Sequence, residues 1–436
     1  MIYLNYLYFL IISLLGFLFL FGSGIVVRHP LDRSQQMKLN GPESLWLLTF
    51  STGLLAFSAG FFGLNLMALR LFVLEGLCLL GLFVSKKHCS NLPVFSAAMW
   101  AYIIYLVWII IGCFYSPSFS YGIRVVLKYL YPFLLCLFAS ATVRDGELFI
   151  KSGQGAALLG VIYLVFSFVP GLYYLVPGVF WYGTASAINL ISLMIFCLTL
   201  FFFTDAKSKY FILTLLFFLP CFIWVFRTSI LGTIVALGAF FFIKYRLKSL
   251  PILFAIGIAG VVAVFTIPRL HDKMFNQRQD VTLEKFEQGK VTIDDVHGNG
   301  REMIWETLDN KFYKGHEIAG SGTGAVQHFL YQGDFMNGLN ASHGDFVQQR
   351  CDNGIIGLVL YALVALFIFL HSFKVYHSTD DVPLKMCALT AGATMMGVYA
   401  TLLSDNVVNY SMATLSMPFG FYGMMLGMLQ KQRGDL

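Results

Sequence analysis

The chain has 436 residues, of which 58% are hydrophobic and only 12% are charged, and its formal net charge is +6. Soluble domains carry about 25% charged residues, so this composition excludes a soluble enzyme with an ordinary surface. The apolar residues form long continuous stretches instead of short alternating strands, which excludes a β-barrel. We therefore expect an all-α polytopic membrane protein.

Apolar stretches of about 20 residues predict the membrane spans in chain order. The first stretch has no basic segment before it and no small-residue cleavage site, so we interpret it as a retained helix and not as a signal peptide. Spans are predicted at 3–27, 44–63, 66–85, 92–113, 125–142, 154–172, 184–204, 210–226, 229–243, 250–267, 354–373, 385–404 and 411–429. The boundaries around Asn65–Arg70 are crowded, so both 12 and 13 transmembrane helices stay open.

The basic residues lie in alternate connections, as is typical of the cytoplasmic side of a membrane protein. This pattern places the C-terminus in the cytoplasm, whereas the side of the N-terminus depends on the span count. One large polar loop, residues 268–353, falls on the opposite, external side and holds 13 of the 23 acidic residues. The sequence predicts an N-terminal bundle of about ten spans (1–267), this external loop with short helices (268–353), and C-terminal transmembrane helices (354–436).

Several features restrict the function. The eight cysteines show no paired spacing and are expected to be packing residues. The basic residues are scattered among turns, so no nucleic-acid partner is expected. The spans carry no series of acidic residues of the kind that a proton-coupled pump uses. Asp405, at the external end of one span, is expected to be a cap or turn residue.

Cations near the external ends of spans are the first candidate site residues. Arg227 lies between two apolar runs, 211–226 and 230–243. A cation there is costly unless it lies at an interface or in a watery cavity with an anionic partner. Arg124 and Lys128, near the external end of span 125–142, could likewise contact an anionic ligand. Simple snorkelling of each side chain to the interface is the alternative.

The external loop holds two further candidate motifs. Arg301 begins a short amphipathic helix that places Trp305 one turn along on the same face. Gly320, Gly322 and Gly324 then alternate with small residues and could offer backbone N–H groups to an anion. The alternative for the Arg301 segment is a solvated surface helix, and the alternative for the glycine stretch is a flexible turn. The glycine stretch lacks the lysine of a P-loop.

Residues 342–345 form a Ser-x-x-Asp pattern that predicts a helix capped by Ser342. His343 would then occupy the first turn, where the helix dipole disfavours a charged imidazole. A neutral ring could accept a proton. The alternative is an ordinary histidine, since the loop contains five.

The segment Arg301–Gly357 resembles the signature of the O-antigen ligase/polymerase superfamily, which comprises Wzy-type polymerases and WaaL-type ligases. The residues that carry the resemblance are Arg301 with Trp305, the Gly320-x-Gly322-x-Gly324 stretch, His343-x-x-Phe346, the run Asp352-Asn353-Gly354-Ile355-Ile356-Gly357 and, after a mid-chain span, Arg227-Thr228-Ser229. Gly344 departs from the pattern, because many relatives carry asparagine or another polar residue there.

The resemblance implies a GT-C-like membrane glycosyltransferase of the bacterial inner membrane, with its active site on the periplasmic face. Its donor would be a glycan linked to undecaprenyl pyrophosphate. Arg227 and Arg301 would clamp the pyrophosphate, and His343 would deprotonate the acceptor hydroxyl. Arginines that neutralise the leaving group make a metal unnecessary, so no cofactor is expected, and direct displacement would invert the anomeric carbon.

Among members of the superfamily, we favour a polymerase that extends the repeat units of O-antigen, capsule or exopolysaccharide. A ligase that moves glycan from the same carrier onto lipid A-core is the alternative. A flippase or transporter of lipid-linked sugar is a different class, in which the arginines would bind pyrophosphate and His343 would be dispensable. Membrane lipid and a chain-length regulator of the Wzz type are the further partners that the resemblance suggests.

Overall fold

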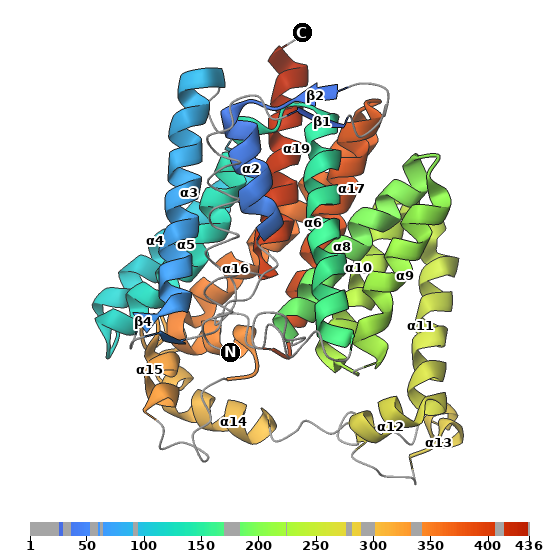
Figure 1. Ribbon diagram of the computed structural model, residues 1–436. Helices are drawn as coiled ribbons and strands as arrows, with labels where there is room; N and C mark the ends of the chain where they lie inside the picture. Colours follow the sequence, from blue (N-terminus) through green and yellow to red (C-terminus); the bar gives the residue numbers. More distant parts are fainter. Residues whose placement is uncertain are drawn as a thin grey trace.

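The computed structural model is a bundle of long helices with a group of short helices, α12 to α15, at one end (Figure 1). The C-terminus lies at the opposite end of the bundle. The structure describes residues 26–28, 36–52, 60–61, 64–89, 95–169, 184–223, 225–275, 281–288, 301–332, 342–405 and 414–434.

The long helices follow one another through most of the described chain. They are α2 (Gly41–Thr52), α3 (Leu66–Cys89), α4 (Ala97–Phe114), α5 (Phe119–Thr142), α6 (Gly146–Phe168), α8 (Thr184–Phe203), α9 (Lys207–Ile223), α10 (Arg227–Tyr245), α11 (Leu250–Thr266), α16 (Asp345–Ser378), α17 (Val382–Thr401) and α19 (Ser416–Gly434). The shorter helical elements are η1 (Arg246–Ser249), α12 (Pro268–Phe275), α13 (Leu283–Glu287), α14 (Arg301–Leu308), the π-helix η3 (Asp309–Tyr313) and α15 (Ala325–Tyr331). Two short antiparallel pairs complete the elements: β1 (Val26–Arg28) with β2 (Gln36–Lys38), and β3 (Gly60–Phe61) with β4 (Leu64–Asn65).

The prediction of an all-α polytopic membrane protein is confirmed. Within the described residues, six segments are long and apolar enough to cross a membrane: Ala97–Phe114, Phe119–Thr142, Gly146–Val165, Ser186–Phe203, Arg227–Thr266 and Asp345–Ser378. Long helices also occupy the other predicted spans from 66 onwards. The predicted span 3–27 lies almost wholly outside the described residues, and the total of 12 or 13 spans stays a prediction.

Helices from both ends of the chain share one hydrophobic core. Helix α10 packs along α17, α19 packs along α5, and α16 packs between α4 and α17. The contact of α10 with α17 is close because glycines face each other: a Cβ on Gly232 would lie 2.8 Å from the Gly397 carbonyl oxygen. Small residues allow such close backbone approach between membrane helices. This packing fixes the start of α10 relative to the end of α17.

Helix α16 is kinked at Gly354, whose φ of 66° and ψ of −169° are not helical. The predicted span 354–373 starts at this kink, and the nine preceding residues form a polar first part of the helix. A Cβ at position 354 would lie 2.2 Å from the Ile318 carbonyl oxygen, so the kink depends on glycine. The kink turns the first part of α16 toward the short helices.

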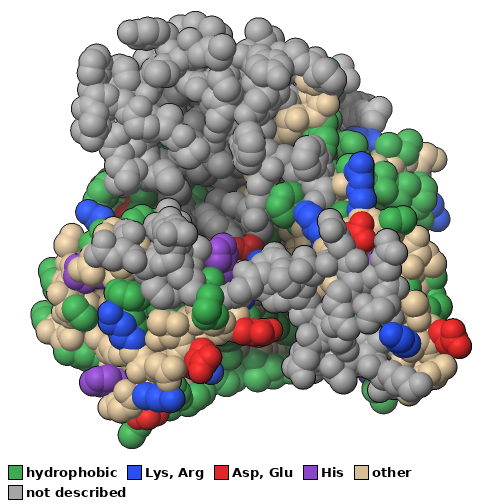
Figure 2. All heavy atoms as spheres, turned by 90° about the horizontal axis from the view of Figure 1, so that it is seen from below, with side chains coloured by type: hydrophobic (Ala, Val, Ile, Leu, Met, Phe, Trp, Pro, Cys, Tyr) green, Lys and Arg blue, Asp and Glu red, His purple; other side chains and the backbone are tan. Residues whose placement is uncertain are grey.

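Charged and histidine side chains are found at the end that carries α12 to α15 (Figure 2). There the start of α10, the start of α14 and the start of α16 lie near one another.

Candidate active site at the end of the helical bundle

Arg227 is placed by a sharp break between α9 and α10. Val225 has a φ of 51°, and the backbone N–H of Phe226 reaches back to the Cys221 carbonyl oxygen. A β-branched residue in the left-handed region is strained, and such strain is common at functional sites. Arg227 is the first residue of α10, and its guanidinium donates a hydrogen bond of 3.1 Å to the Lys273 carbonyl oxygen on α12. The break therefore presents the guanidinium toward the short helices.

A cavity of about 840 Å³ begins at this guanidinium. Arg227, Arg301, Trp305 and the carboxylate-bearing Glu302 line it together. Apolar residues line most of the remainder, and they come from α9, α10, α11 and α12: Phe218, Phe222, Ile230, Leu231, Ile234, Leu237, Ile256, Gly257, Ala259, Gly260, Val261, Ala263, Val264, Leu270 and Met274. The cavity is thus a largely apolar space between membrane helices that carries cationic groups at the end of the short helices.

The two arginines predicted from the sequence lie near each other. Both line the same cavity, and Arg227 experiences the positive charge of Arg301. Two like charges in a partly buried space repel each other unless an anion lies between them. Guanidinium groups bind phosphate oxygens in a planar, bidentate manner. The pair is therefore suited to an anion with several oxygens.

His343 lies close enough to Arg301 to experience its positive charge. Burial and the positive charge of Arg301 lower the pKa of His343, whereas the negative charge of Asp405 raises it. The net lowering keeps the ring neutral near pH 7, so it can accept a proton. The three residues at the centre of the prediction, Arg227, Arg301 and His343, are thus brought to one end of the molecule, although their roles stay predictions.

The predicted cap at Ser342 is wrong. Helix α16 begins at Asp345, and its N-cap is Gly344, without a side-chain cap. His343 precedes the helix in the left-handed region, with a φ of 52°, and does not occupy its first turn. The Ser342 hydroxyl instead donates to the Gly344 carbonyl oxygen at 3.3 Å and to Gln348 Oε1 at 3.2 Å. Burial and Arg301, rather than a position inside the first turn, account for the neutral ring.

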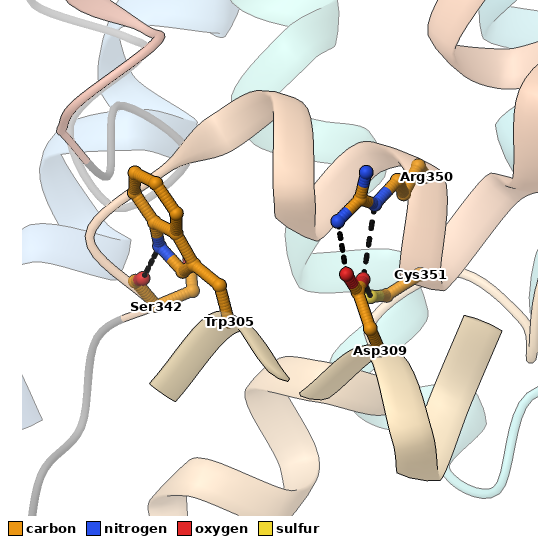
Figure 3. A network of polar contacts seen from close by, with 5 residues as sticks. All are labelled: Trp305, Asp309, Ser342, Arg350 and Cys351. Atoms are coloured by element: carbon orange, nitrogen blue, oxygen red, sulfur yellow. Dashed lines mark hydrogen bonds and ion pairs between the residues drawn. The ribbon is translucent and has the colours of Figure 1, made fainter. Parts of the chain in front are cut away.

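Trp305 holds the turn that carries His343 (Figure 3). Its indole N–H donates a hydrogen bond of 2.9 Å to the Ser342 carbonyl oxygen. A Cβ at Gly344 would lie 3.2 Å from the Trp305 ring, so the indole covers the other side of the same turn. Trp305 therefore contacts both the cavity and the backbone on either side of His343.

A second connection joins the loop to α16 one turn further along (Figure 3). Arg350 forms an ion pair with Asp309, and Arg350 Nε donates to Asp309 Oδ1 at 3.0 Å. The Cys351 thiol also lies 3.5 Å from Asp309 Oδ1. Because Asp309 directly follows α14, the pair fixes the helix that carries Arg301 against α16.

Asp405 is a site residue that sequence reasoning interpreted only as a cap or turn. It lies just beyond α17, with 8% of its surface exposed. Its carbonyl oxygen and that of Leu402 both accept a hydrogen bond from the Asp345 backbone N–H, each at 3.0 Å. This contact joins the end of α17 to the start of α16 and places Asp405 close enough to His343 to raise its pKa. The only signal in the sequence was an acidic residue at the external end of a span.

The structure gives the glycine stretch a structural role. Its N–H groups already have acceptors in the protein: Gly320 donates to the His316 carbonyl, Gly322 to the Asp352 carbonyl, and Gly324 to the Asp352 carboxylate at 3.1 Å. The same carboxylate accepts from the Val326 N–H at 2.8 Å. All three glycines have positive φ and press against other backbone segments. This geometry argues against the predicted presentation of these N–H groups to an anion.

Arg124 and Lys128 lie on α5 and do not line the cavity. The Arg124 guanidinium is exposed and stacks on Tyr121, at 4.9 Å from the ring centroid. Lys128 is partly buried and interacts electrostatically with Asp345, two residues beyond His343. Lys128 is therefore a neighbour of the His343 segment, and the predicted contact of both cations with ligand remains a prediction.

Within the described ranges, no three side chains of histidine, cysteine, aspartate or glutamate are grouped so that they could hold a metal ion. The groups that the site does offer are two guanidiniums, a neutral imidazole and the carboxylates of Glu302 and Asp405. Such a set can bind an anion and move a proton.

Comparison with known families agrees with the position of this site. Residues 212–362 match the family model described as O-antigen ligase. The matched stretch begins within α9 and ends within α16, so it contains Arg227, Arg301, Trp305 and His343. No curated protein matches the chain.

Proposed function

The chain belongs to the O-antigen ligase/polymerase superfamily, and on this premise we propose that it polymerises glycan repeat units carried on undecaprenyl pyrophosphate. The observation that carries the proposal is the arrangement at the cavity. Arg227 and Arg301 lie together at the polar end of a largely apolar space, and His343 lies next to Arg301. A lipid-linked diphosphate donor has the same two parts, an apolar chain and an anionic head.

The apolar part of the cavity suits the polyprenyl chain. Its walls come from α9, α10 and α11, and α11 contributes small residues there, such as Gly257, Ala259 and Gly260. A Cβ added at Gly257 would meet no atom within 4 Å, so this face of α11 is not packed against a neighbouring helix. In the proposal, the lipid chain lies in this space between α10 and α11, and the diphosphate reaches the two arginines.

The reaction that we propose is a direct displacement at the anomeric carbon. The acceptor hydroxyl oxygen attacks this carbon and its proton passes to the neutral His343 ring. The bond from the anomeric carbon to the diphosphate oxygen breaks, and its electron pair stays on the diphosphate. Arg227 and Arg301 stabilise the charge that develops there, which is the role that a metal ion has in other transferases. The anomeric configuration is inverted.

Asp405 would assist His343 after the transfer of the proton. A carboxylate close to an imidazole favours the protonated ring. Arg301 has the opposite effect, so Arg301 disfavours the protonated ring and Asp405 favours it. In this proposal the ring is neutral before the reaction, and Asp405 stabilises the imidazolium that forms.

A ligase that transfers the glycan to lipid A-core is the second candidate, because the matched family model is described as O-antigen ligase. Both reactions use the same donor chemistry and differ in the acceptor. The full-length protein, purified and supplied with carrier-linked repeat units alone, separates them. A ladder of lengthened chains supports the polymerase, whereas product that forms only after lipid A-core is added supports the ligase.

Two histidine variants test the catalytic assignment in the same assay. His343→Ala is expected to abolish transfer and to leave donor binding intact, because the arginines remain. His316→Ala is the matched control, since this histidine lies in the same loop, is exposed, and uses only its backbone in hydrogen bonds that the structure shows. Polymer at the wild-type level in His343→Ala would exclude the role of His343 as the base.

A further inference from the structure

A second cavity, of about 390 Å³, lies at the end of the bundle opposite to the candidate active site. It is formed by the start of α4, the last turns of α16 and the last turns of α19. Its lining residues are Phe95, Ser96, Ala97, Ala98, Phe367, Leu370, His371, Lys374, Leu426 and Leu429.

This cavity lies at the level of a membrane interface. Phe95 and Trp100 are both exposed, and their rings lie 5.6 Å apart beside the start of α4. Aromatic side chains are enriched at the boundary between lipid and water. Lys374 lies in the last turns of α16 and is exposed. Exposed aromatic rings together with a lysine are typical of the level at which lipid head groups lie.

The lining combines an apolar wall with cationic and hydrogen-bonding groups. Phe367, Leu370, Leu426 and Leu429 supply the apolar part. The polar part consists of Lys374, Ser96 and His371, and the described residues that line the cavity include no aspartate or glutamate. Such a combination fits a molecule with acyl chains and a negatively charged head group.

Two of the polar groups, His371 and Ser96, are held in place by a partly buried network. His371 Nδ1 lies 2.8 Å from the Tyr422 hydroxyl, which in turn lies 2.7 Å from the Ser96 hydroxyl. Ser96 also caps α4 by accepting from the Met99 N–H. The network joins α4, α16 and α19 at the cavity, so its shape is determined by the fold and not by one mobile side chain. The first turn of α4 adds the partial positive charge of a helix N-terminus.

We propose that this cavity binds an anionic glycerophospholipid, with the phosphate near Lys374 and the acyl chains along α16 and α19. Basic pockets between membrane helices at the cytoplasmic side bind anionic head groups in this way. The positive-inside pattern predicts that this end faces the cytoplasm. The site is separate from the proposed donor cavity, which is lined by α9 to α12 and by α14.

The experiment uses the purified full-length protein in detergent and native mass spectrometry. Dioleoylphosphatidylglycerol and dioleoylphosphatidylcholine are titrated separately, without any donor substrate. The wild-type protein is expected to bind phosphatidylglycerol more tightly. Lys374→Ala should weaken phosphatidylglycerol binding about fivefold, because one lysine near a membrane surface contributes about that factor, and should leave phosphatidylcholine binding unchanged.

Two further variants make the result specific to the cavity. Lys207→Ala removes another exposed lysine, at the start of α9, that does not line the cavity, and should leave both affinities unchanged. Leu370→Trp enlarges a side chain that is 50% exposed, keeps every charge, and should weaken the binding of both lipids. Thermal unfolding verifies that each variant is folded.

The proposal is overturned if wild-type protein binds the two lipids equally, if Lys374→Ala and Lys207→Ala have equal effects, or if Leu370→Trp binds both lipids like the wild type. Because the readout is lipid binding without donor, a failure of the glycosyltransferase proposal would not affect it.

Discussion

Gly322 offers a direct test of whether the glycine stretch is structural or binds the donor. Its φ is +103°, and a Cβ there would lie 2.4 Å from the Ser116 Cα, an atom of the backbone between α4 and α5. Ordinary contact begins at 3.4 Å, so Gly322→Ala must push the two segments about 1 Å apart. The neighbouring Thr323 would be disturbed, because its N–H donates to Gly112 and its hydroxyl to Ile109.

The matched control is Gly315→Ala. Gly315 also has a positive φ, +84°, but a Cβ there would meet nothing within 4 Å. Gly315→Ala should therefore cost only the conformational term, about 1–2 kcal/mol. Gly322→Ala should cost this term, about 1–3 kcal/mol of overpacking, and about 1 kcal/mol for each hydrogen bond of Thr323 that is weakened. With both Thr323 bonds weakened, we expect a total of about 4–7 kcal/mol.

Thermal unfolding of both variants in the same detergent measures the difference, and binding of the lipid-linked donor to the folded fraction is measured in parallel. The midpoint should fall clearly further in Gly322→Ala than in Gly315→Ala, whereas the folded fraction should still bind donor. Equal midpoints for the two variants, together with loss of donor binding in Gly322→Ala alone, would refute the structural role and restore the anion-binding interpretation.

Three further predictions concern the site. Trp305→Phe removes the hydrogen bond to the buried Ser342 carbonyl, which is worth about 1–2 kcal/mol. The rate of transfer should fall about 5–30-fold while donor affinity is retained. An unchanged rate would contradict the role of Trp305 in positioning His343. The pKa of His343 is lowered from 6.5, so the rate of transfer should decline only below that pH. Asp405→Asn removes the group that raises this pKa, so the decline should move to lower pH. A move to higher pH would oppose the assignment. Arg227→Lys keeps the charge but loses the bidentate fork, so KM for the donor should rise, whereas an unchanged KM would argue against the clamp.

The fold was largely predictable because membrane helices are read from hydropathy. The predicted span 184–204 corresponds to α8, Thr184–Phe203, almost residue for residue. The prediction was poorer where a helix continues into protein instead of lipid. Helix α16 starts nine residues before the predicted span, because residues such as Gln349 and Asp352 are polar and yet buried against the loop. A hydropathy window cannot detect a helix that is buried by other protein segments.

The candidate site was predictable as a set of single residues but not as an arrangement. Arg227, Arg301 and His343 each departed from their local context in the sequence, and the structure brings all three to one end. Asp405 follows His343 by 62 positions and carries no motif, so only the contact between α16 and α17 reveals it. The glycine stretch shows the opposite case, because the pattern was clear but the acceptors of its N–H groups come from distant segments.

Two residues with positive φ near the site are held by contacts from the short helices. Val225 and His343 both have positive φ, and each lies two residues before the first residue of a helix, α10 and α16 respectively. Each is held from outside its own segment: Lys273 Nζ donates to the Val225 carbonyl oxygen at 3.3 Å, and Trp305 donates to Ser342. The short helices therefore do more than cover the bundle. Their contacts maintain two unfavourable backbone conformations and keep Arg227 and Arg301 near each other despite their like charges. In the proposed mechanism, a diphosphate that binds between the guanidiniums relieves the repulsion between them, and little reorganisation remains for the reaction itself.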